Sequence, residues 1–351
     1  MIRVGLVGYG VAGKVFHAPM ITAVEGLELA AVVERHSRNA EQLYPNITTY
    51  TSLEAMLEDP SLEVIVIATP NQEHVPLAHK VLDAGRHVVV DKPVGVNSEE
   101  IAELIEHGKR VGKLVIPYHN RRWDNGFRTL KQLLREQRIG DVVYFEATFD
   151  RWRPQPRGSA WRESKVPGSG ILLDLGTHLV DEALQLFGLP LSVSAEVLCE
   201  RPWAVANDSF TIRLRYPRLI ATLSANCLST NSRPHYTVRG TGGGYIKWGL
   251  DPQEARLKET FRVEEPGWGV EPAENWGTLT VDVDGNIASE AIEPIPGDYR
   301  LYYVGVRDAV LGKAAQPVEA IDSWRATRVL ELAEESSQER REIECDWASA
   351  N

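Results

Sequence analysis

Cysteine is scarce in this 351-residue chain, and the scarcity excludes two kinds of scaffold. Cys199, Cys227 and Cys345 are the only cysteines, and they lie far apart in the sequence. Three scattered cysteines make neither a disulfide framework nor a zinc motif, and they suit a reducing compartment. The nine histidines form no HxxxH pair, so the sequence predicts no metal site.

Long apolar runs are also missing. No stretch approaches the roughly 18 residues that a membrane-spanning helix needs. Glycines interrupt residues 1–8 before a signal-peptide core could form there. We therefore expect a cytoplasmic protein with no membrane partner.

Positive charge is in the minority, with 38 Lys and Arg against 49 Asp and Glu and a net charge of −11. An acidic chain repels phosphate backbones. We take residues 120–124 as the densest positive stretch. This stretch is short and includes a carboxylate, so it forms no basic patch, and we expect no nucleic-acid partner. The length exceeds the size at which one hydrophobic core stops growing, which predicts two domains.

The first third of the chain alternates short apolar segments with helical ones. Continuous β-branched runs predict strands that are buried on both faces, at residues 3–7, 29–33, 64–68, 87–90 and 114–116. Helices are expected at 53–57, 74–84 and 98–110, with Ser52 and Asn97 as N-caps of the first and last. This alternation predicts an α/β domain with a parallel sheet over residues 1–119.

Beyond residue 119 the pattern changes to strands that follow one another without intervening helices. Strands are expected at 142–150, 192–198, 209–215, 219–226 and 236–239, with Gly242, Gly243 and Gly244 as turn glycines. Helices are expected at 125–136, 171–187, 302–311 and 323–336. Residues 120–351 are therefore predicted to form an α+β domain with a large, mostly antiparallel open sheet.

A glycine-rich segment follows the first predicted strand. Gly8, Gly10 and Gly13 form a G-x-G-x-x-G pattern together with Val11 and Ala12. The pattern is weak alone, but here it joins a strand to a helix, where glycines let the backbone approach a pyrophosphate at the helix N-terminus. The sequence thus predicts a doubly wound Rossmann domain that binds a dinucleotide.

The choice between NAD and NADP depends on the end of the second predicted strand. Glu34 lies 21 residues after Gly13, where a carboxylate accepts the ribose 2′-hydroxyl of NAD; its other reading is a solvated strand end. Arg35 follows at once, and an arginine can bind the 2′-phosphate of NADP. We favour NAD and leave NADP open.

Three further segments carry polar residues at strand or helix ends. Lys92 follows the fourth strand, His119 and Asn120 follow the fifth, and Asp174 and His178 are spaced i, i+4 on one helix face. Each has an ordinary structural reading, such as a solvated loop lysine or a surface Asp–His hydrogen bond. Taken singly, none of them identifies a catalytic site.

Together these segments are similar to one known family. The chain resembles the glucose–fructose oxidoreductase/inositol dehydrogenase/rhizopine catabolism (Gfo/Idh/MocA) family along nearly its whole length, and most of all its scyllo-inositol dehydrogenase branch. The resemblance rests on the glycine segment, on residues 16–19, 68–70, 91–93 and 118–125, and on 161–163, 173–178, 268–269 and 302–303. Two residues depart from the family pattern: Asp91 replaces a glutamate, and Glu34 stands where NADP-using members of the branch carry a small hydroxyl residue.

The resemblance implies a catalytic set of Lys92, Asp174 and His178, with a cis peptide bond before Pro93. It implies a substrate site that includes the catalytic set with His119, Arg153 and Tyr236. The implied dinucleotide-binding residues, beside those of the glycine segment, are Glu34, Arg35, Ala68, Thr69, Pro70, His74, Asp91, Lys92, Asn120, Trp161 and Arg162.

The function implied is hydride transfer between NAD(P) and a secondary alcohol or ketone of a cyclitol or sugar. A homodimer or homotetramer formed through the sheet of the second domain is also implied. Three alternatives stay open: a non-catalytic dinucleotide-binding sensor, an enzyme that uses NAD during glycoside cleavage, and a reductase of a non-sugar carbonyl.

Overall fold

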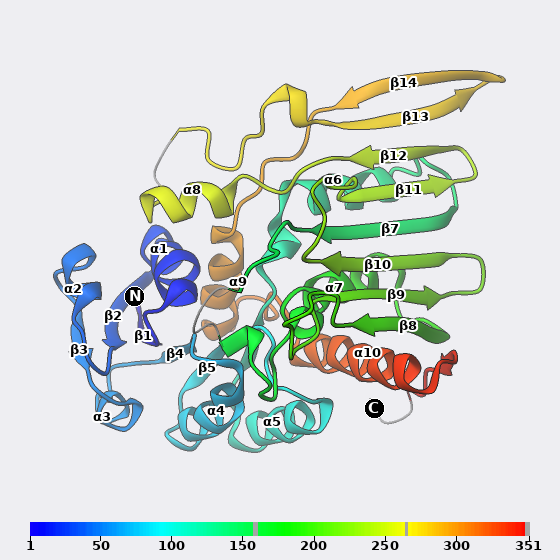
Figure 1. Cartoon of the computed structure of the whole chain (residues 1–351). Coiled ribbons are helices and arrows are strands. Elements are labelled where there is room, and N and C mark those ends of the chain that lie inside the picture. Colours follow the sequence, from blue (N-terminus) through cyan, green and yellow to red (C-terminus); the bar gives the residue numbers. More distant parts are fainter. Residues whose placement is uncertain (157–160, 264–265, 348–351) are drawn as a thin grey trace. The chain divides into compact units, whose positions relative to one another are not determined.

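The chain folds into two compact units, each assembled from separated stretches of sequence (Figure 1). The computed structural model describes residues 1–156, 161–263 and 266–347. The first unit contains residues 1–123, 252–268 and 298–324, and the second contains 124–251, 269–297 and 325–351. The predicted boundary after residue 119 separates the first strands from the rest of the chain. It does not include residues 252–268 and 298–324, with which the chain returns twice to the first unit.

The first unit is built on a six-stranded parallel sheet in the order β3-β2-β1-β4-β5-β6. The strands are β1 (Ile2–Val7), β2 (Leu27–Val33), β3 (Thr48–Tyr50), β4 (Val64–Ile67), β5 (His87–Asp91) and β6 (Val115–Tyr118). The strand order reverses between β1 and β4, as in a doubly wound sheet, so their carboxyl ends bound the crevice where such folds bind ligands. The predicted Rossmann fold is confirmed.

Two helices of the first unit begin at the N-caps that the sequence predicts. The helices of this unit are α1 (Ala18–Ala23), α2 (Asn39–Leu43), α3 (Leu53–Leu57), α4 (His74–Asp83), α5 (Ser98–Val111), α8 (Gln253–Thr260) and α9 (Arg300–Val310). The Ser52 hydroxyl accepts the Ala55 N–H, and the Asn97 side chain accepts the Glu100 N–H, so both predicted N-caps are confirmed. The short elements β3 and α2 were missed because neither is long enough to show a periodicity.

The returning segments complete the core of the first unit. Leu257, Trp268, Tyr299, Tyr302 and Tyr303 are buried in one cluster with apolar residues of the strands and of α1. The Tyr302 hydroxyl donates to the carbonyl oxygen of Ile116 in β6 at 3.3 Å. Burial of these large rings explains why residues remote in sequence belong to the dinucleotide-fold unit.

The second unit is built on a nine-stranded sheet in the order β14-β13-β12-β11-β7-β10-β9-β8-β15. Its strands are β7 (Val142–Asp150), β8 (Ser192–Leu198), β9 (Ser209–Arg215), β10 (Ile220–Asn226), β11 (Tyr236–Gly240), β12 (Gly243–Lys247), β13 (Gly277–Val283), β14 (Asn286–Ile292) and β15 (Ile343–Glu344). Among the strands that the structure describes in this sheet, only β7 and β10 pair in parallel, which confirms a mostly antiparallel sheet. The assignment of Gly243 and Gly244 to a turn was wrong, because both lie in β12.

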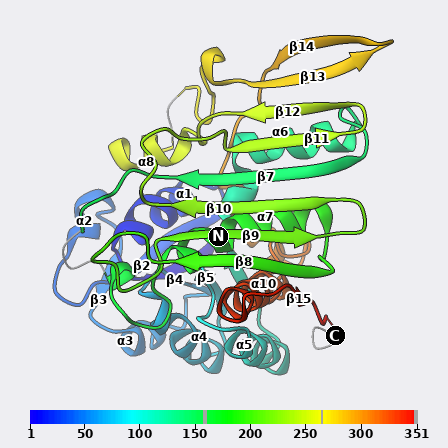
Figure 2. The same cartoon turned by 45° about the vertical axis from the view of Figure 1, so that its right-hand side comes forward.

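Three helices cover one face of this sheet and leave the other open (Figures 1 and 2). They are α6 (Asn125–Arg135), α7 (Thr177–Phe187) and α10 (Ala320–Glu339). On β7, Phe145, Ala147 and Phe149 point into this core, whereas Tyr144 and Glu146 alternate onto the open face. Within the described residues, no helix is both long and apolar enough to cross a membrane.

Candidate active site

The glycine segment is shaped by close backbone contacts at two of its three glycines. Gly8 has φ +96°, and a Cβ there would lie 2.7 Å from the carbonyl oxygen of Ala68. A Cβ at Gly13 would lie 2.1 Å from the carbonyl oxygen of Gly8. A Cβ at Gly10 would meet no protein atom within 4 Å, so this backbone is open to a ligand. The segment thus offers the cradle that a pyrophosphate needs.

A cavity of about 540 Å³ adjoins this cradle and is lined by Gly8, Gly10, Glu34, Arg35 and Thr69, among others. Its size suits the adenosine half of a dinucleotide. The Glu34 side chain is buried at the cavity wall; its two oxygens accept the Ser37 hydroxyl at 2.7 Å and the Ala40 N–H at 2.8 Å. Because each carboxylate oxygen accepts more than one bond, Glu34 keeps capacity for a ribose hydroxyl.

The other predicted dinucleotide-binding residues of the first unit lie on the cavity wall or elsewhere in that unit. Arg35 lies on the cavity and pairs with Glu73 at 3.5 Å. Val11 is 69% exposed, whereas Ala68 is buried and Pro70 half-buried. Asn120 is buried in a short 3-10 turn, Asn120–Trp123. His119, predicted for the substrate, is buried with its Nε2 at 2.8 Å from the Ser323 hydroxyl.

The predicted catalytic lysine follows β5, at the carboxyl edge of the sheet. The Lys92–Pro93 bond is cis, as the resemblance implied. The backbone N–H of Lys92 donates to Asp91 Oδ1 at 2.8 Å, and Asp91 Oδ2 lies 3.8 Å from His17 Nε2. Burial acts to raise the pKa of Asp91, but the nearby His17 and the charge of Lys92 lower it overall. Asp91 therefore stays ionised and holds the backbone of Lys92.

The predicted Asp174 and His178 occur on a helix of the second unit that begins irregularly. Residues Leu172–Gly176 form a π-helical turn, and α7 continues from Thr177, so the single α-helix expected over 171–187 was wrong at its start. The Asn207 side chain accepts the Leu172 N–H at 2.8 Å and anchors this turn. Such π turns within helices are frequent at functional sites.

Two arginines flank the Asp174 carboxylate. Arg151 Nη1 lies 3.7 Å from Asp174 Oδ2, and Arg162 Nε lies 3.6 Å from Asp174 Oδ1. His178, four residues further on, is buried with a fractional exposure of 5%. Two guanidinium groups favour the ionised carboxylate at this point.

Sequence reasoning missed Arg151, although a signal was present. Residues 151–165 contain four arginines and one lysine, a longer positive stretch than residues 120–124. The fold places the carboxylate of Asp174, from outside this stretch, beside Arg151 and Arg162. The conclusion that 120–124 is the densest positive stretch was wrong, because residues 109–113 carry two lysines and one arginine.

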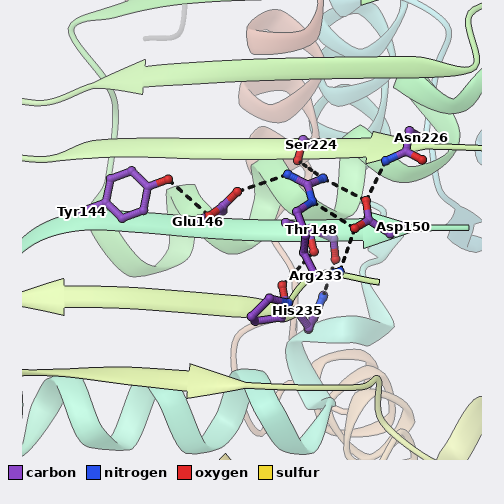
Figure 3. Close-up of polar contacts among 9 residues, drawn as sticks. Tyr144, Glu146, Thr148, Asp150, Ser224, Asn226, Arg233 and His235 are labelled. Atoms are coloured by element: carbon purple, nitrogen blue, oxygen red, sulfur yellow. Dashed lines mark hydrogen bonds and ion pairs between the residues drawn. The ribbon is translucent and has the colours of Figure 1, made fainter. Parts of the chain in front are cut away.

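The end of β7, from which Arg151 emerges, is held by a network on the open face of the sheet (Figure 3). Arg233 donates to both oxygens of Asp150, at 2.8 and 3.0 Å, and to the Ser224 hydroxyl at 2.9 Å. Asp150 also accepts the Asn226 side-chain amide at 2.7 Å. A bidentate arginine–carboxylate pair with further donors is a geometrically specific lock.

The remaining predicted residues of the second unit lie close to this strand end or on a nearby turn. His235 bonds the Thr148 carbonyl oxygen at 2.8 Å, and its ring lies 4.1 Å from that of Tyr236, which is fully buried. The Arg153 backbone N–H donates to Cys227 at 2.8 Å. The Arg162 guanidinium lies 4.6 Å from the ring of Trp161. Among the described residues, no group of three or more His, Cys, Asp or Glu side chains could hold a metal ion.

Comparison with known proteins identifies a family for both units of the chain. Residues 2–119 match the oxidoreductase-family NAD-binding Rossmann fold (GFO_IDH_MocA), and residues 131–345 match the C-terminal alpha/beta domain of the same family. The chain is 42% identical over 339 residues to the uncharacterized oxidoreductase YdgJ of Escherichia coli, covering 97% of each. It is 33% identical over 342 residues to the scyllo-inositol 2-dehydrogenase (NADP(+)) IolW of Bacillus subtilis, covering 97% of this chain and 95% of that one.

A solved structure agrees as well. The putative oxidoreductase YPO2259 of Yersinia pestis superposes with a TM-score of 0.92 at 42% identity, covering 98% of this chain and 97% of that one. Together the two family models cover nearly the full length of the chain, as does each of these relatives. The chain belongs to the Gfo/Idh/MocA oxidoreductase family and carries its NAD-binding Rossmann domain.

Proposed function

We propose that this oxidoreductase transfers hydride between NAD(P) and a secondary alcohol or ketone of a cyclitol or sugar. The observation that carries the proposal is a set of polar residues in each unit: Lys92 follows β5 and is held by Asp91, and Asp174 and His178 lie at the start of the helix of the second unit. The name of one relative, a scyllo-inositol dehydrogenase, supports the cyclitol class.

The proposed chemistry follows from the protons that must move. A secondary alcohol releases hydride only as its hydroxyl proton leaves, since otherwise a protonated ketone forms. His178, whose ordinary pKa is about 6.5, takes that proton as the general base. The Lys92 ammonium stabilises the developing alkoxide, and Asp174 balances charge and orients its partners. A bound nicotinamide supplies the hydride acceptor.

The cofactor preference is proposed from the wall of the cavity. The Glu34 carboxylate is fixed by Ser37 and Ala40, so it cannot swing away easily to admit a 2′-phosphate. Fixed negative charge repels a phosphate and accepts a 2′-hydroxyl, which favours NAD. Arg35 lines the same cavity, and an arginine can bind the 2′-phosphate of NADP. The relative IolW is named as NADP-dependent.

A homo-oligomer through the open sheet is proposed from the composition of that face. The Ile246 and Ile287 side chains lie on it with exposures of 41% and 73%, and the strand register places them on the same side as Glu146 of the Arg233 network. An uncovered nine-stranded sheet with such residues suits burial against a second copy. Sedimentation of the wild type and of an Ile246→Lys variant measures the oligomeric state. The variant should dissociate more readily than the wild type, and a monomeric wild type contradicts the proposed homo-oligomer.

The test of function is a screen of inositols and aldoses with NAD and NADP, followed by the absorbance of the reduced dinucleotide. Turnover of one cyclitol or pyranose with release of free reduced dinucleotide supports a dehydrogenase. Glycoside cleavage without net reduction supports the alternative chemistry, and dinucleotide binding with no turnover of any substrate supports a sensor. Faster turnover of simple aliphatic alcohols contradicts a polyol site, because buried polar groups reject substrates that lack matching hydroxyls.

A further inference from the structure

One buried histidine touches both loops that border the dinucleotide cradle in the first unit. His74 is the first residue of α4 and is only 1% exposed. Its Nε2 lies 2.8 Å from the carbonyl oxygen of Thr69, which lines the cavity, and its Nδ1 lies 2.8 Å from the carbonyl oxygen of Pro93, next to Lys92. The ring therefore bridges residues 68–70, the threonine loop, and residues 91–93, the lysine loop.

We infer that His74 is a positioning residue that acts through the carbonyl of Pro93 to set the place of Lys92. This inference rests on the proposed catalytic role of Lys92. The resemblance had assigned His74 to dinucleotide binding; its ring nitrogens, however, both face backbone carbonyls, so its effect on a ligand is exerted through the two loops.

The lysine loop is held at two points, one on each side of the Lys92 side chain. The Asp91 carboxylate accepts the Lys92 N–H at 2.8 Å, and Asp91 itself lies 3.8 Å from His17. His17 in turn bonds the Tyr303 hydroxyl at 2.7 Å through Nδ1. His74 Nδ1 lies 2.8 Å from the carbonyl oxygen of Pro93, the residue after Lys92. Two fixed backbone points around one residue limit where its side chain can depart, which is the requirement for a pre-organised catalytic group.

The proton count of the ring shows which contact matters. A neutral imidazole has one N–H, whereas both partners here are carbonyl oxygens that only accept. Burial is the largest influence on the pKa of His74 and lowers it, against the opposing effects of Asp91 and the two carbonyls. Pro93 is buried and Thr69 is half-buried, so of the two residues Thr69 is the more open to water. Leaving a buried acceptor unsatisfied costs more, so the geometry assigns the N–H to Nδ1 and Pro93.

Two conservative variants separate the halves of this bridge. In His74→Asn the side-chain amide nitrogen stands near the place of Nδ1 and retains a donor for Pro93. In His74→Gln it stands near the place of Nε2 and retains a donor for Thr69 only. We expect His74→Ala and His74→Gln to lower kcat by about tenfold to a hundredfold, the effect of a misplaced catalytic group. His74→Asn should retain most of kcat.

The matched control is His79→Ala, on the same helix, whose ring bonds His107 and neither loop. Dinucleotide affinity by calorimetry and the melting temperature are measured on every variant. A purely structural role predicts that kcat follows the melting temperature across all four variants. The inference expects kcat to separate Asn from Gln at similar melting temperatures, and equal kcat in these two variants overturns it.

A double variant with Lys92→Met closes the test. If His74 acts through Lys92, His74→Ala should cost little further turnover once Lys92 is absent, because residues acting as one unit are not additive. Multiplied losses overturn the inference and leave the proposed function standing. Near-normal turnover of Lys92→Met alone contradicts the proposed function itself, and with it the inference.

Discussion

Glu34 accepts the backbone N–H of Ala40 at 2.8 Å, so the carboxylate that we propose selects the cofactor also holds the start of α2. The Ser37 hydroxyl donates to the other oxygen at 2.7 Å. The proposed cofactor selection and the local structure at the start of α2 therefore depend on the same side chain, so a substitution at Glu34 affects both.

The first prediction concerns this residue. Glu34→Ser should lower NADH affinity by about tenfold or more, since a hydrogen bond to a charged group is worth about 1.5–3 kcal/mol. It should raise NADPH affinity, because the repulsion of the 2′-phosphate is removed. Calorimetry with both dinucleotides measures this, and Glu34→Gln, which keeps an acceptor of the same size, is the control. Tighter binding of NADPH than of NADH by the wild type would show that Glu34 does not select NAD.

The second prediction separates the roles of two glycines. Gly13→Ala should lower the melting temperature of the unliganded protein, because its Cβ would lie 2.1 Å from the Gly8 carbonyl oxygen. Gly10→Ala should leave that temperature unchanged, because its Cβ meets no protein atom within 4 Å, but it should abolish dinucleotide binding. Thermal melts with and without NADH report both effects; undiminished stabilisation of Gly10→Ala by NADH would mean that the dinucleotide lies elsewhere.

The third prediction concerns the proposed catalytic set. Lys92→Met and His178→Ala should each lower turnover by at least about a hundredfold, the lower range for a lost acid–base group. Both should still bind the dinucleotide, since the glycine cradle and Glu34 are untouched. Asp174→Asn should lower turnover less if it only orients its partners.

Activity, melting temperature and dinucleotide affinity are measured on the same His178→Ala sample. If His178 were only a core residue, stability would fall while turnover per folded molecule stayed normal. That result would remove His178 from the mechanism.

The fourth prediction concerns pH. His79 Nδ1 lies 2.6 Å from His107 Nδ1, so the contact needs at least one neutral ring. Burial and then the neighbouring His107 lower the pKa of His79. A histidine whose folded-state pKa is lowered contributes its stability above the unfolded value of about 6.5, and this contribution is lost as the pH falls below that value. Melting temperatures from pH 8 downwards should therefore fall less steeply in His79→Gln than in the wild type.

The fifth prediction concerns a buried ion pair of the second unit. Lys247 Nζ lies 2.8 Å from Glu271 Oε1, and both side chains are almost wholly buried. Burial raises the pKa of Glu271 despite this partner. Lys247→Met should cost about 3–5 kcal/mol in the free energy of unfolding, the usual penalty for a buried charge left alone. The double variant with Glu271→Gln should recover part of this loss in chemical denaturation, and an equal or larger loss would show that the ion pair is not the cause.

The sequence alone determined the parallel sheet, the glycine cradle and the two predicted N-caps. These features follow from local patterns: apolar runs of strand length, glycines between a strand and a helix, and a polar cap before a helical segment. Such signals are written within about ten neighbouring residues, and the structure retains them. The family resemblance also rested on short segments of this kind.

Only the tertiary structure decided the contacts between remote residues. The flanking of Asp174 by Arg151, the bridge of His74 between Thr69 and Pro93, and the return of α8 and α9 to the first unit join positions that share no local pattern. Gly243 and Gly244 resembled a turn, but pairing of β12 between β11 and β13 extended them into a strand. Pairing partners and buried polar partners are chosen by packing and desolvation across the whole unit, and a linear pattern does not encode them.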